Sequence, residues 1–545
     1  MLSPPTRRLS AVLLAALLWA GCTGCGSEPS ERPGASADGP HRGGQVVVAL
    51  TSDINGINNL IVPASVTTTE VLRQLFLPLV FEQPDSRTIE PALAESWEFS
   101  EDRLELTFHL RDDVQWSDGT PVTADDVAFT FSAWTSPEVG WESAAAIEAI
   151  DRVEVVDPQT ARFHFNRAYA GQLLDAATLG VILPQHAWGA LPFAEWRDGA
   201  DWFRDHLVVN GPFNLASWTP QQEIVLERNP LYYRDGLPHL DRVVLRVVPD
   251  QTNQSTQLLN GQADLVIQLS PESAERVEEA SDVELYPYWT RGYIAVAWNL
   301  NRDGLADARV RRALTHGIDR ETLVESIWGS YARPLSGPIP PDVWLYDDSL
   351  EPLAYDPETA RRLLAEAGWT DGDGDGTVDR DGRPLRLRLL TNSGNQQRED
   401  AAVLIQEQLG RIGIDIVADV LEFNTMIAQA QQGDFDGLIF GITLPTTFDL
   451  SYAVHTDSIE SGTNLAGFSN PEADRLADEI RQQPTLEQAQ PMYDRLQRIL
   501  RDEQPYTFLW QSQRLVGARA RVHGVDPNHL FTLWDLDEWW VDDES

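Results

Sequence analysis

The chain has 545 residues, of which 84 are acidic and 41 are basic, giving a formal net charge of -43 at pH 7. This excess of acid disfavours nucleic acid and anionic membrane surfaces as partners, because both carry the same sign of charge. All the basic residues are arginine, and the absence of lysine excludes a P-loop, a Schiff base and the S-x-x-K nucleophile motif. Hydrophobic residues make up 42% of the chain, which at this length predicts more than one domain.

The start of the chain has the features of an export signal. Two arginines precede an apolar stretch, residues 9–20, that is too short to span a bilayer. The small residues before Cys22 resemble the lipobox of bacterial lipoproteins. We therefore expect residues 1–21 to be a signal peptide and Cys22 to carry a lipid. Cys25 is a second candidate, and a plain secretory signal with two incidental cysteines is the alternative.

A polar segment and then a short apolar strand follow the signal. Residues 22–44 are rich in Ser, Pro, Gly and Glu, which predicts a disordered tether. Residues 46–50 read VVVAL, which predicts a buried strand. Ligands of α/β proteins lie at the carboxyl ends of such strands, so we predict that Thr51 and Asp53 contact the ligand.

The next informative segment predicts a strand, a turn and a capped helix. Residues 104–111 alternate large apolar with polar side chains, the period of a half-buried strand. Residues 117–119, Ser-Asp-Gly, predict a turn. Thr123 then stands as an N-cap, and Asp125 and Asp126 place acids at the positive end of the helix dipole.

The run from Pro91 to Phe131 contains LAESW and then LRDDVQWSDGTPVTADDVAF. It closely resembles the signature segment of the family 5 extracytoplasmic solute-binding proteins, the ligand receptors of ABC importers for oligopeptides, dipeptides, nickel and some oligosaccharides. VVNGPF at 208–213 and the segments 216–233 and 295–320 also resemble that family. The resemblance implies an α/β fold of the two-lobed, type II periplasmic-binding-protein class with an additional inserted domain.

The resemblance also implies a domain organisation. Domain I is expected to be discontinuous and to comprise residues 45–77, 208–292 and 505–540. Domain II, residues 78–207, is inserted and carries the signature. Domain III, residues 293–504, is the opposing ligand-binding lobe. Within it, the helix starting at Ala308 is expected to turn its arginines to solvent.

An acidic turn in domain III has the spacing of a calcium loop. Asp371, Asp373, Asp375 and Asp379 fall at positions one, three, five and nine of such a loop, which turns alternate oxygens toward a hard cation. The twelfth position is Gly382 instead of the bidentate glutamate. Structural calcium at the four aspartates therefore stands beside the alternative of a solvated turn, and no other cofactor is expected.

The segment from Thr443 to Asp449 departs from the family pattern. The tryptophan that usually follows the preceding strand is Ile442, and the aspartate that pairs a peptide's α-ammonium in typical oligopeptide receptors falls at 444–445, Leu-Pro. Asp449 is the only carboxylate in this loop. An ammonium buried without a counter-charge is costly, so a free peptide N-terminus is less secure as a ligand group. We predict ligand contacts at Thr443, Thr446, Thr447 and Asp449.

Five further residues are predicted to face the cleft: Trp134, Tyr293, Trp298, Asn299 and Tyr331. Trp298 and Asn299 match an F-N pair of the family at the end of a strand near the hinge. Core packing is the alternative for each aromatic residue, while several together would offer flat apolar surface to sugars or apolar side chains.

No catalytic pattern accompanies these residues. The chain has neither H-E-x-x-H nor G-x-S-x-G, and we expect no enzyme activity. The sequence predicts a monomeric receptor, lipid-anchored outside the cell membrane, that captures a peptide by hinge closure and presents it to an ABC permease. Its membrane contact is expected through the lipid only. An oligosaccharide or another polar solute is the alternative ligand, and an extracytoplasmic hydrolase or an adhesin is the remote alternative.

Overall fold

The structure, a computed structural model, describes residues 39–62, 65–178 and 180–542. The predicted signal peptide, Cys22 and Cys25 lie outside the described residues, as does most of the predicted tether. The described part of that tether contacts the folded body. The Gly43 N–H donates to the His239 carbonyl oxygen at 2.9 Å, and the His41 ring lies 5.3 Å from the ring of Trp540, centroid to centroid.

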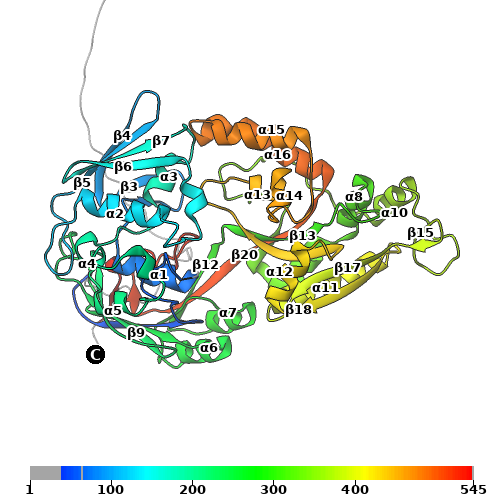
Figure 1. Cartoon of the computed structure of the whole chain (residues 1–545). Helices are drawn as coiled ribbons and strands as arrows, with labels where there is room; N and C mark the ends of the chain where they lie inside the picture. The colour runs from blue at the N-terminus through cyan, green and yellow to red at the C-terminus, as the bar shows by residue number, and fades with distance from the viewer. Residues whose placement is uncertain (1–38, 63–64, 179, 543–545) are drawn as a thin grey trace, which may run out of the picture. The chain divides into compact units, whose positions relative to one another are not determined.

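A mixed twelve-stranded sheet organises the described chain, and one long strand joins its two halves. This strand is β20 (Tyr506–Arg519). Its N-terminal part pairs with β13 (Gly292–Trp298), and its C-terminal part pairs with β11 (Leu265–Val266) and β12 (Val283–Trp289). Figure 1 shows β20 running between the two groups of strands. The chain therefore passes between the halves along β20 and at the β12–β13 junction.

The first half of the sheet is built on β1 (Gln45–Leu50), which confirms the strand predicted at 46–50. It pairs in parallel with β10 (Arg242–Val247) and β11, and its alternate valines at 46 and 48 are fully buried. The other elements of this half are β8 (Phe213–Thr219), β9 (Glu223–Arg228), α1 (Val66–Leu75), α6 (Gln251–Leu259) and α7 (Pro271–Glu278).

The second half contains β13, β19 (Gly437–Thr443), β17 (Arg386–Asn392) and β18 (Asp415–Leu421), with β17 parallel to both β18 and β19. Two separate apolar cores pack around these strands. The first contains residues of α8 (Ala308–Gly317), α9 (Arg320–Trp328), α10 (Pro357–Glu366) and α11 (Gln396–Gly410). The second contains residues of α13 (Ser451–Val454), α15 (Pro471–Gln482) and α16 (Leu486–Glu503).

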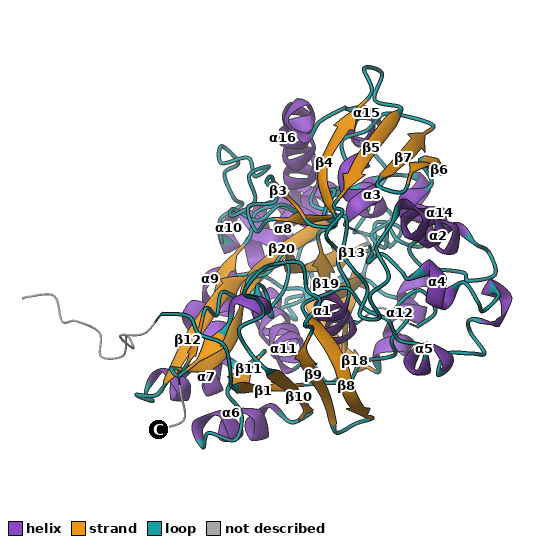
Figure 2. Cartoon of the chain, turned by 90° about the vertical axis from the view of Figure 1, so that its left-hand side faces the viewer, coloured by secondary structure: helices purple, strands orange, loops and turns teal. Residues whose placement is uncertain are grey.

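A separate antiparallel sheet lies between β1 and β8 in the sequence, and it contains the signature segment. Its order is β4 (Ala94–Phe99), β5 (Glu105–Leu110), β7 (Thr160–Phe165) and β6 (Ile150–Asp157). Figure 2 shows these strands together, apart from the long sheet. β5 and the following α2 (Ala124–Thr135) confirm the predicted strand and helix.

The acids at the start of α2 have different roles. Asp125 is exposed, but Asp126 is buried and accepts hydrogen bonds from the Thr123 N–H at 2.9 Å, the Gln185 N–H at 2.8 Å and the Trp116 indole at 3.3 Å. Asp126 therefore ties the helix start to two distant segments. Its burial raises the pKa of its carboxyl group.

The remaining elements are short or flank the two sheets. They are β2 (Val80–Glu82), β3 (Ile89–Pro91), α3 (Gln172–Ala177), α4 (Gln185–Trp188), α5 (Trp202–Asp205), β14 (Ala332–Pro334), β15 (Asp379–Arg380), β16 (Arg383–Pro384), α12 (Phe423–Gln431), α14 (Asp457–Glu460), β21 (Val522–His523), β22 (Trp540–Val541) and the 3-10 helices η1 (Ala144–Ile147), η2 (Phe193–Glu195), η3 (Gly329–Tyr331) and η4 (Leu536–Glu538).

One expectation about α8 is wrong. Arg311 is only 2% exposed, and its guanidinium donates to the carbonyl oxygens of Leu305, Ala306 and Glu503. A buried arginine is tolerated when its donors are paired, and here backbone carbonyl groups and the Glu503 carboxylate, at 3.3 Å, pair them. The arginines of α8 therefore do not all face solvent.

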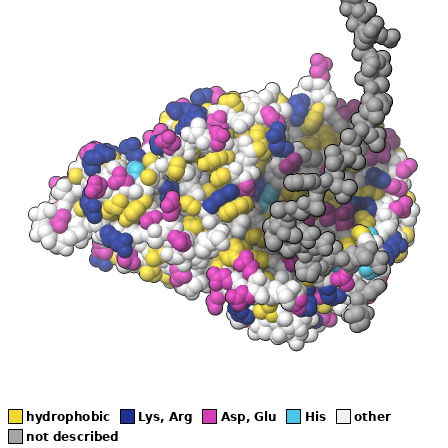
Figure 3. Space-filling view, turned by 180° about the vertical axis from the view of Figure 1, so that it is seen from behind, with side chains coloured by type: hydrophobic (Ala, Val, Ile, Leu, Met, Phe, Trp, Pro, Cys, Tyr) yellow, Lys and Arg dark blue, Asp and Glu magenta, His cyan; other side chains and the backbone are white. Residues whose placement is uncertain are grey.

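The architecture is the expected two-lobed α/β fold. The half sheet around β1 and the half sheet around β13 each have their own core, and they share β20. The residue boundaries of domains I to III stay a prediction. On the face in Figure 3, arginines lie among acidic side chains instead of forming one basic patch. Ion pairs such as Arg495 with Glu472 at 2.8 Å exemplify this pattern.

Candidate functional site

A cavity of about 520 Å³ opens where the β12–β13 junction meets the end of β19. We call it the arginine cavity, because Arg291, Arg398 and Arg514 line it. Tyr293 and Thr443, both predicted ligand contacts, also line it. The arginine cavity thus takes residues from both half sheets, as a site between two lobes requires.

The three arginines differ in how their charge is balanced. Arg291 pairs with Glu82 at 3.1 Å, and both side chains are buried. Arg398 donates to the Asn392 side-chain oxygen at 2.8 Å, but neither it nor Arg514 forms an ion pair with any described carboxylate. Burial lowers the pKa of the Arg398 guanidinium. Glu70 is buried in the same cavity and feels the charge of Arg514, but three arginines against this one described acid still favour an anionic group in a chain with a charge of -43.

Helix α11 adds to this preference. Arg398 is its third residue, and the N–H groups of the first turn already carry partial positive charge. An arginine in the first turn is repelled by this partial positive charge, and a nearby anion would offset the repulsion. Helix N-termini bind carboxylates and phosphates readily. The Arg398 Nε is buried with no partner among the described residues, which leaves one donor available to a ligand.

The loop from Thr443 to Asp449 lines the arginine cavity with its first residue and a second cavity with later ones. This second cavity has a volume of about 400 Å³ and is lined by Thr447 and Asp449 of the loop and by Tyr169, Asp175, Tyr452 and Tyr493. We call it the tyrosine–aspartate cavity. Thr446 lines neither cavity, but its carbonyl oxygen accepts from Arg291 at 3.4 Å. The loop that departs from the family pattern therefore contributes to both cavities.

The other predicted contacts lie in packed positions. The Asp53 carboxylate accepts from the Trp218 indole at 3.0 Å and from the Gln221 N–H at 2.7 Å. The Trp298 indole donates to Thr507 Oγ1 at 2.9 Å. The remaining four line neither cavity. Thr51 is half-buried after β1, and the ring of Trp134 is buried with its centroid 5.3 Å from that of Trp141. The Asn299 amide donates to the carbonyl oxygens of Gly433 and Phe435, and burial of Tyr331 raises its pKa to about 12. A ligand role for these residues stays a prediction.

The acidic turn brings three of its four predicted aspartates together. Carboxylate oxygens of Asp371, Asp373 and Asp375 lie within 4.8 Å of one another, and all three residues are exposed. Asp379 instead accepts from the Gly372 N–H at 3.1 Å. Asp371 already accepts from the backbone N–H groups of the turn, at 2.7 Å from Gly374. Structural calcium stays a prediction.

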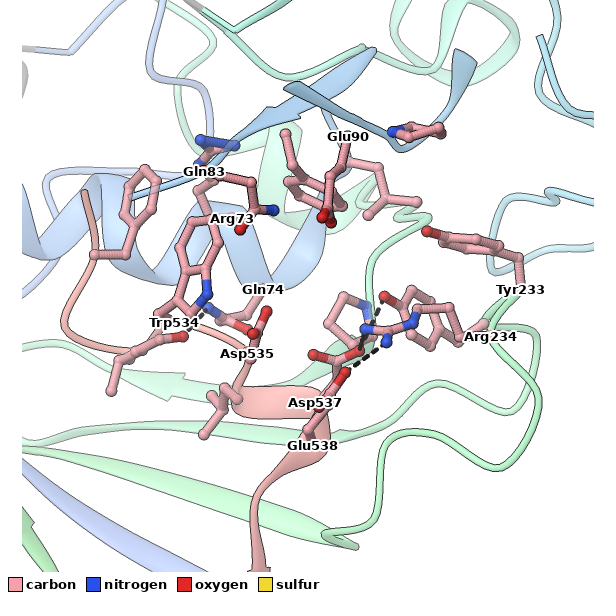
Figure 4. Close-up of a pocket in the computed structure, with 18 residues that line it drawn as sticks. Arg73, Gln74, Gln83, Glu90, Tyr233, Arg234, Trp534, Asp535, Asp537 and Glu538 are labelled. Carbon is pink, nitrogen blue, oxygen red and sulfur yellow. Dashed lines mark hydrogen bonds and ion pairs between the residues drawn. The ribbon is translucent and has the colours of Figure 1, made fainter. Parts of the chain in front are cut away.

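A third cavity, of about 400 Å³, contains a cluster of ion pairs among its lining residues. Figure 4 shows Arg234 directed at Asp537 and Glu538, with which it forms ion pairs. Arg73 lies over the Phe531 ring, its guanidinium carbon 4.1 Å from the ring centroid. None of the predicted ligand residues lines this cavity, so the candidate site is the arginine cavity.

Buried carboxyl groups predict a pH dependence of stability. Burial raises the pKa of Asp175 to about 7 and that of Asp535 to about 6. The folded chain therefore keeps protons that the unfolded chain loses near pH 4, and the stability from these groups is lost as pH rises through 6 and 7. We expect the thermal midpoint to fall as pH rises from 5 to 8, with a smaller fall in D175N. Scanning calorimetry at several pH values checks this, and an unchanged or rising midpoint would contradict it.

Known proteins with similar sequences and structures have the same two-lobed fold. The model of the bacterial extracellular solute-binding proteins, family 5 (middle), matches residues 88–461. The oligopeptide-binding protein AppA of Bacillus subtilis is 28% identical over 537 residues, covering 98% of both chains. Di/tripeptide-binding protein 2 of Pseudomonas aeruginosa is 28% identical over 475 residues, 83% of this chain and 86% of the relative. The structure of Bacillus subtilis AppA in complex with a nonapeptide has a TM-score of 0.76 and 28% identity, covering 92% of this chain and all of that one.

A two-lobed α/β fold with a charged cavity between its half sheets defines an extracellular solute-binding protein. The chain belongs to the bacterial extracellular solute-binding proteins, family 5, because the family model spans more than half of it. The resemblance inferred from the signature segment is thereby confirmed. None of the described helices combines the length and apolarity that a membrane span needs.

The sequence alone did not single out the arginines of the site. With 41 arginines in the chain, no local pattern marks Arg291 or Arg514. Arg398 follows the buried strand β17 and lies in the first turn of α11, where its charge opposes the helix dipole, but the sequence alone did not predict that helix. The cavity becomes visible only when the two half sheets are brought together.

Proposed function

We propose that this chain is the peptide receptor of an ABC importer. The observation that carries the proposal is the arginine cavity, where Arg398 of α11 and Arg514 of β20, neither of them in an ion pair, can hold the carboxylate of a peptide. The names of the relatives reported above, an oligopeptide-binding and a di/tripeptide-binding protein, support it. Neither name supports the oligosaccharide alternative.

Capture requires that the two lobes close on the peptide. Only a closed form contacts ligand from both half sheets, so peptide binding shifts the population toward that form. The β12–β13 junction and β20 are the connections about which closure takes place. The closed receptor then presents the peptide to the permease, and the chain releases it without chemical turnover.

The location follows from the start of the sequence. We infer that residues 1–21 are removed, that Cys22 carries the lipid, and that the receptor is a monomer held at the outer surface of the cytoplasmic membrane or its periplasmic face. The lipobox-like residues before Cys22 and the family's extracellular description support this. The lipid is then the only membrane contact.

Native mass spectrometry of the protein purified from its source tests the proposal. We expect a co-purifying set of peptide masses that is lost on denaturation, together with a protein mass that begins at a lipid-modified Cys22. A hexose-based ligand mass would contradict the peptide assignment. An unmodified N-terminus beyond Cys22 would contradict the anchor while leaving the peptide assignment intact.

A further inference from the structure

The tyrosine–aspartate cavity is lined by two carboxylates from segments far apart in the sequence. Asp175 lies on α3 and is 5% exposed, and Asp449 ends the loop after β19. One Asp175 oxygen accepts from the Tyr169 hydroxyl at 2.7 Å, and Asp449 accepts from the Ser451 N–H at 2.8 Å. The walls approach closely here, since a Cβ on Gly171 would lie 2.8 Å from a methyl group of Thr447.

No cation of the described chain balances these two acids. Neither Asp175 nor Asp449 forms an ion pair with a described arginine or histidine, although Arg167 and Arg481 stand at the rim. Arg167 pairs with Glu148 at 2.9 Å, and Arg481 pairs with Asp478 at 2.6 Å. The rim arginines are therefore paired locally, and the two acids of the cavity have no arginine or histidine partner among the described residues.

The charge of Asp449 reaches its neighbours across the cavity. Burial raises the pKa of Asp175, Tyr452 and Tyr493, and in each case Asp449 raises it further. Arg167 acts on Asp175 in the opposite sense, more weakly than Asp449. A cation placed between the two carboxylates would relieve this repulsion.

The rest of the lining selects the kind of cation. The Tyr452 hydroxyl is buried with no partner among the described residues, so it can accept or donate one more hydrogen bond. Pro445, Ile480 and Leu486 supply apolar walls. A calcium ion needs six to eight oxygen ligands, whereas an ammonium on an aliphatic stem needs only a few acceptors, apolar walls and aromatic faces.

We propose that the tyrosine–aspartate cavity binds the lysine side chain of the peptide ligand. The stem packs on the apolar walls, and the ammonium donates to Asp175, Asp449 and the Tyr452 hydroxyl. This inference rests on the proposed peptide function. It assigns opposite charge preferences to the two cavities that the 443–449 loop lines, an anion at the arginine cavity and a cation here.

Calorimetry with matched peptides tests the site. The probes are tetra-alanine peptides in which lysine is placed at each position in turn, each compared with the same peptide carrying norleucine, a stem of similar length without charge. We expect the best lysine peptide to bind about 10-fold more tightly than its norleucine partner, because hydrogen bonds from an ammonium to carboxylates are charge-assisted. Equal affinities at every position would overturn the inference, and the peptide function would stand.

Three variants assign the preference to this cavity. D449N and D175N are expected to remove most of it, and Y452F is expected to reduce it while leaving the fold intact, because its hydroxyl has no partner among the described residues. The control is E479Q, which makes the same charge change on α15 outside the cavity. A lysine preference that survives in D449N and Y452F would overturn the assignment even if D175N fails to fold.

A second probe keeps this test independent of the peptide function. If none of the peptides binds, the peptide function fails, and binding of 1,5-diaminopentane then tests whether the cavity is a cation site. Saturable binding that D449N removes and E479Q retains supports a cation site. No saturable binding to the wild-type chain overturns it.

Discussion

Replacing Arg291 by methionine is expected to lower the free energy of unfolding by about 3–5 kcal/mol, because it leaves a buried carboxylate without its partner. The side chains of Arg291 and Glu82 are 7% and 4% exposed, and their atoms lie 3.1 Å apart. Arg291 also lies over the Phe448 ring and donates to the Thr446 carbonyl oxygen. The substitution therefore loosens the β12–β13 junction from both β2 and the 443–449 loop.

Urea unfolding followed by tryptophan fluorescence measures this effect. R495M is the control, because Arg495 forms an exposed pair with Glu472 whose loss is expected to cost less than about 1 kcal/mol. The double variant R291M/E82L, which removes both charges, is expected to recover part of the loss. A stability of R291M within about 1 kcal/mol of the wild type would contradict the prediction.

Replacing Arg398 by methionine is expected to weaken peptide binding by about 10- to 100-fold, the range for a charge-assisted hydrogen-bonded pair. Arg398 has no described carboxylate partner, its Nε is free of partners among the described residues, and it sits at the positive end of α11. Methionine keeps most of the stem's volume, so the loss reports on the charge. Isothermal calorimetry with tetra-alanine measures it, and R475M, an exposed arginine of α15, is the matched control.

A peptide with an amidated C-terminus shows which group Arg398 contacts. Amidation is expected to weaken peptide binding to the wild type by about the same factor as the R398M substitution does. Amidation is expected to weaken binding to R398M only a little further, because the interaction between Arg398 and the carboxylate is already lost. If amidation weakens binding to R398M as much as it weakens binding to the wild type, Arg398 contacts another part of the peptide. Unchanged affinity in R398M would remove it from the site.

Several elements were predictable because their sequences carry a local signal. The alternation at 104–111, the turn at 117–119 and the acids after Thr123 predicted β5 and α2, and the apolar run at 46–50 predicted β1. Each signal comes from a few adjacent residues whose side-chain period or cap chemistry fixes the backbone. The family resemblance then supplied the two-lobed class that these elements alone could not.

The candidate site was predictable only in part. Tyr293 and Thr443 line the arginine cavity, and Thr447 and Asp449 line the tyrosine–aspartate cavity, as expected of a loop singled out for its departure from the family pattern. Asp53 and Asn299 bear the polar groups expected of ligand contacts, yet those groups are bonded within the protein. Whether a polar side chain faces a ligand or its own chain depends on neighbours distant in sequence.

The sequence by itself determined the class of this protein and the strands and helices with strong local signals, because these depend on residues close together in the chain. Only the tertiary structure decided which arginines of the described residues form no ion pair and which acids line one cavity. Arg398 and Arg514, like Asp175 and Asp449, are far apart in sequence, and the cost of leaving their charges unpaired arises only when folding brings them together and removes water.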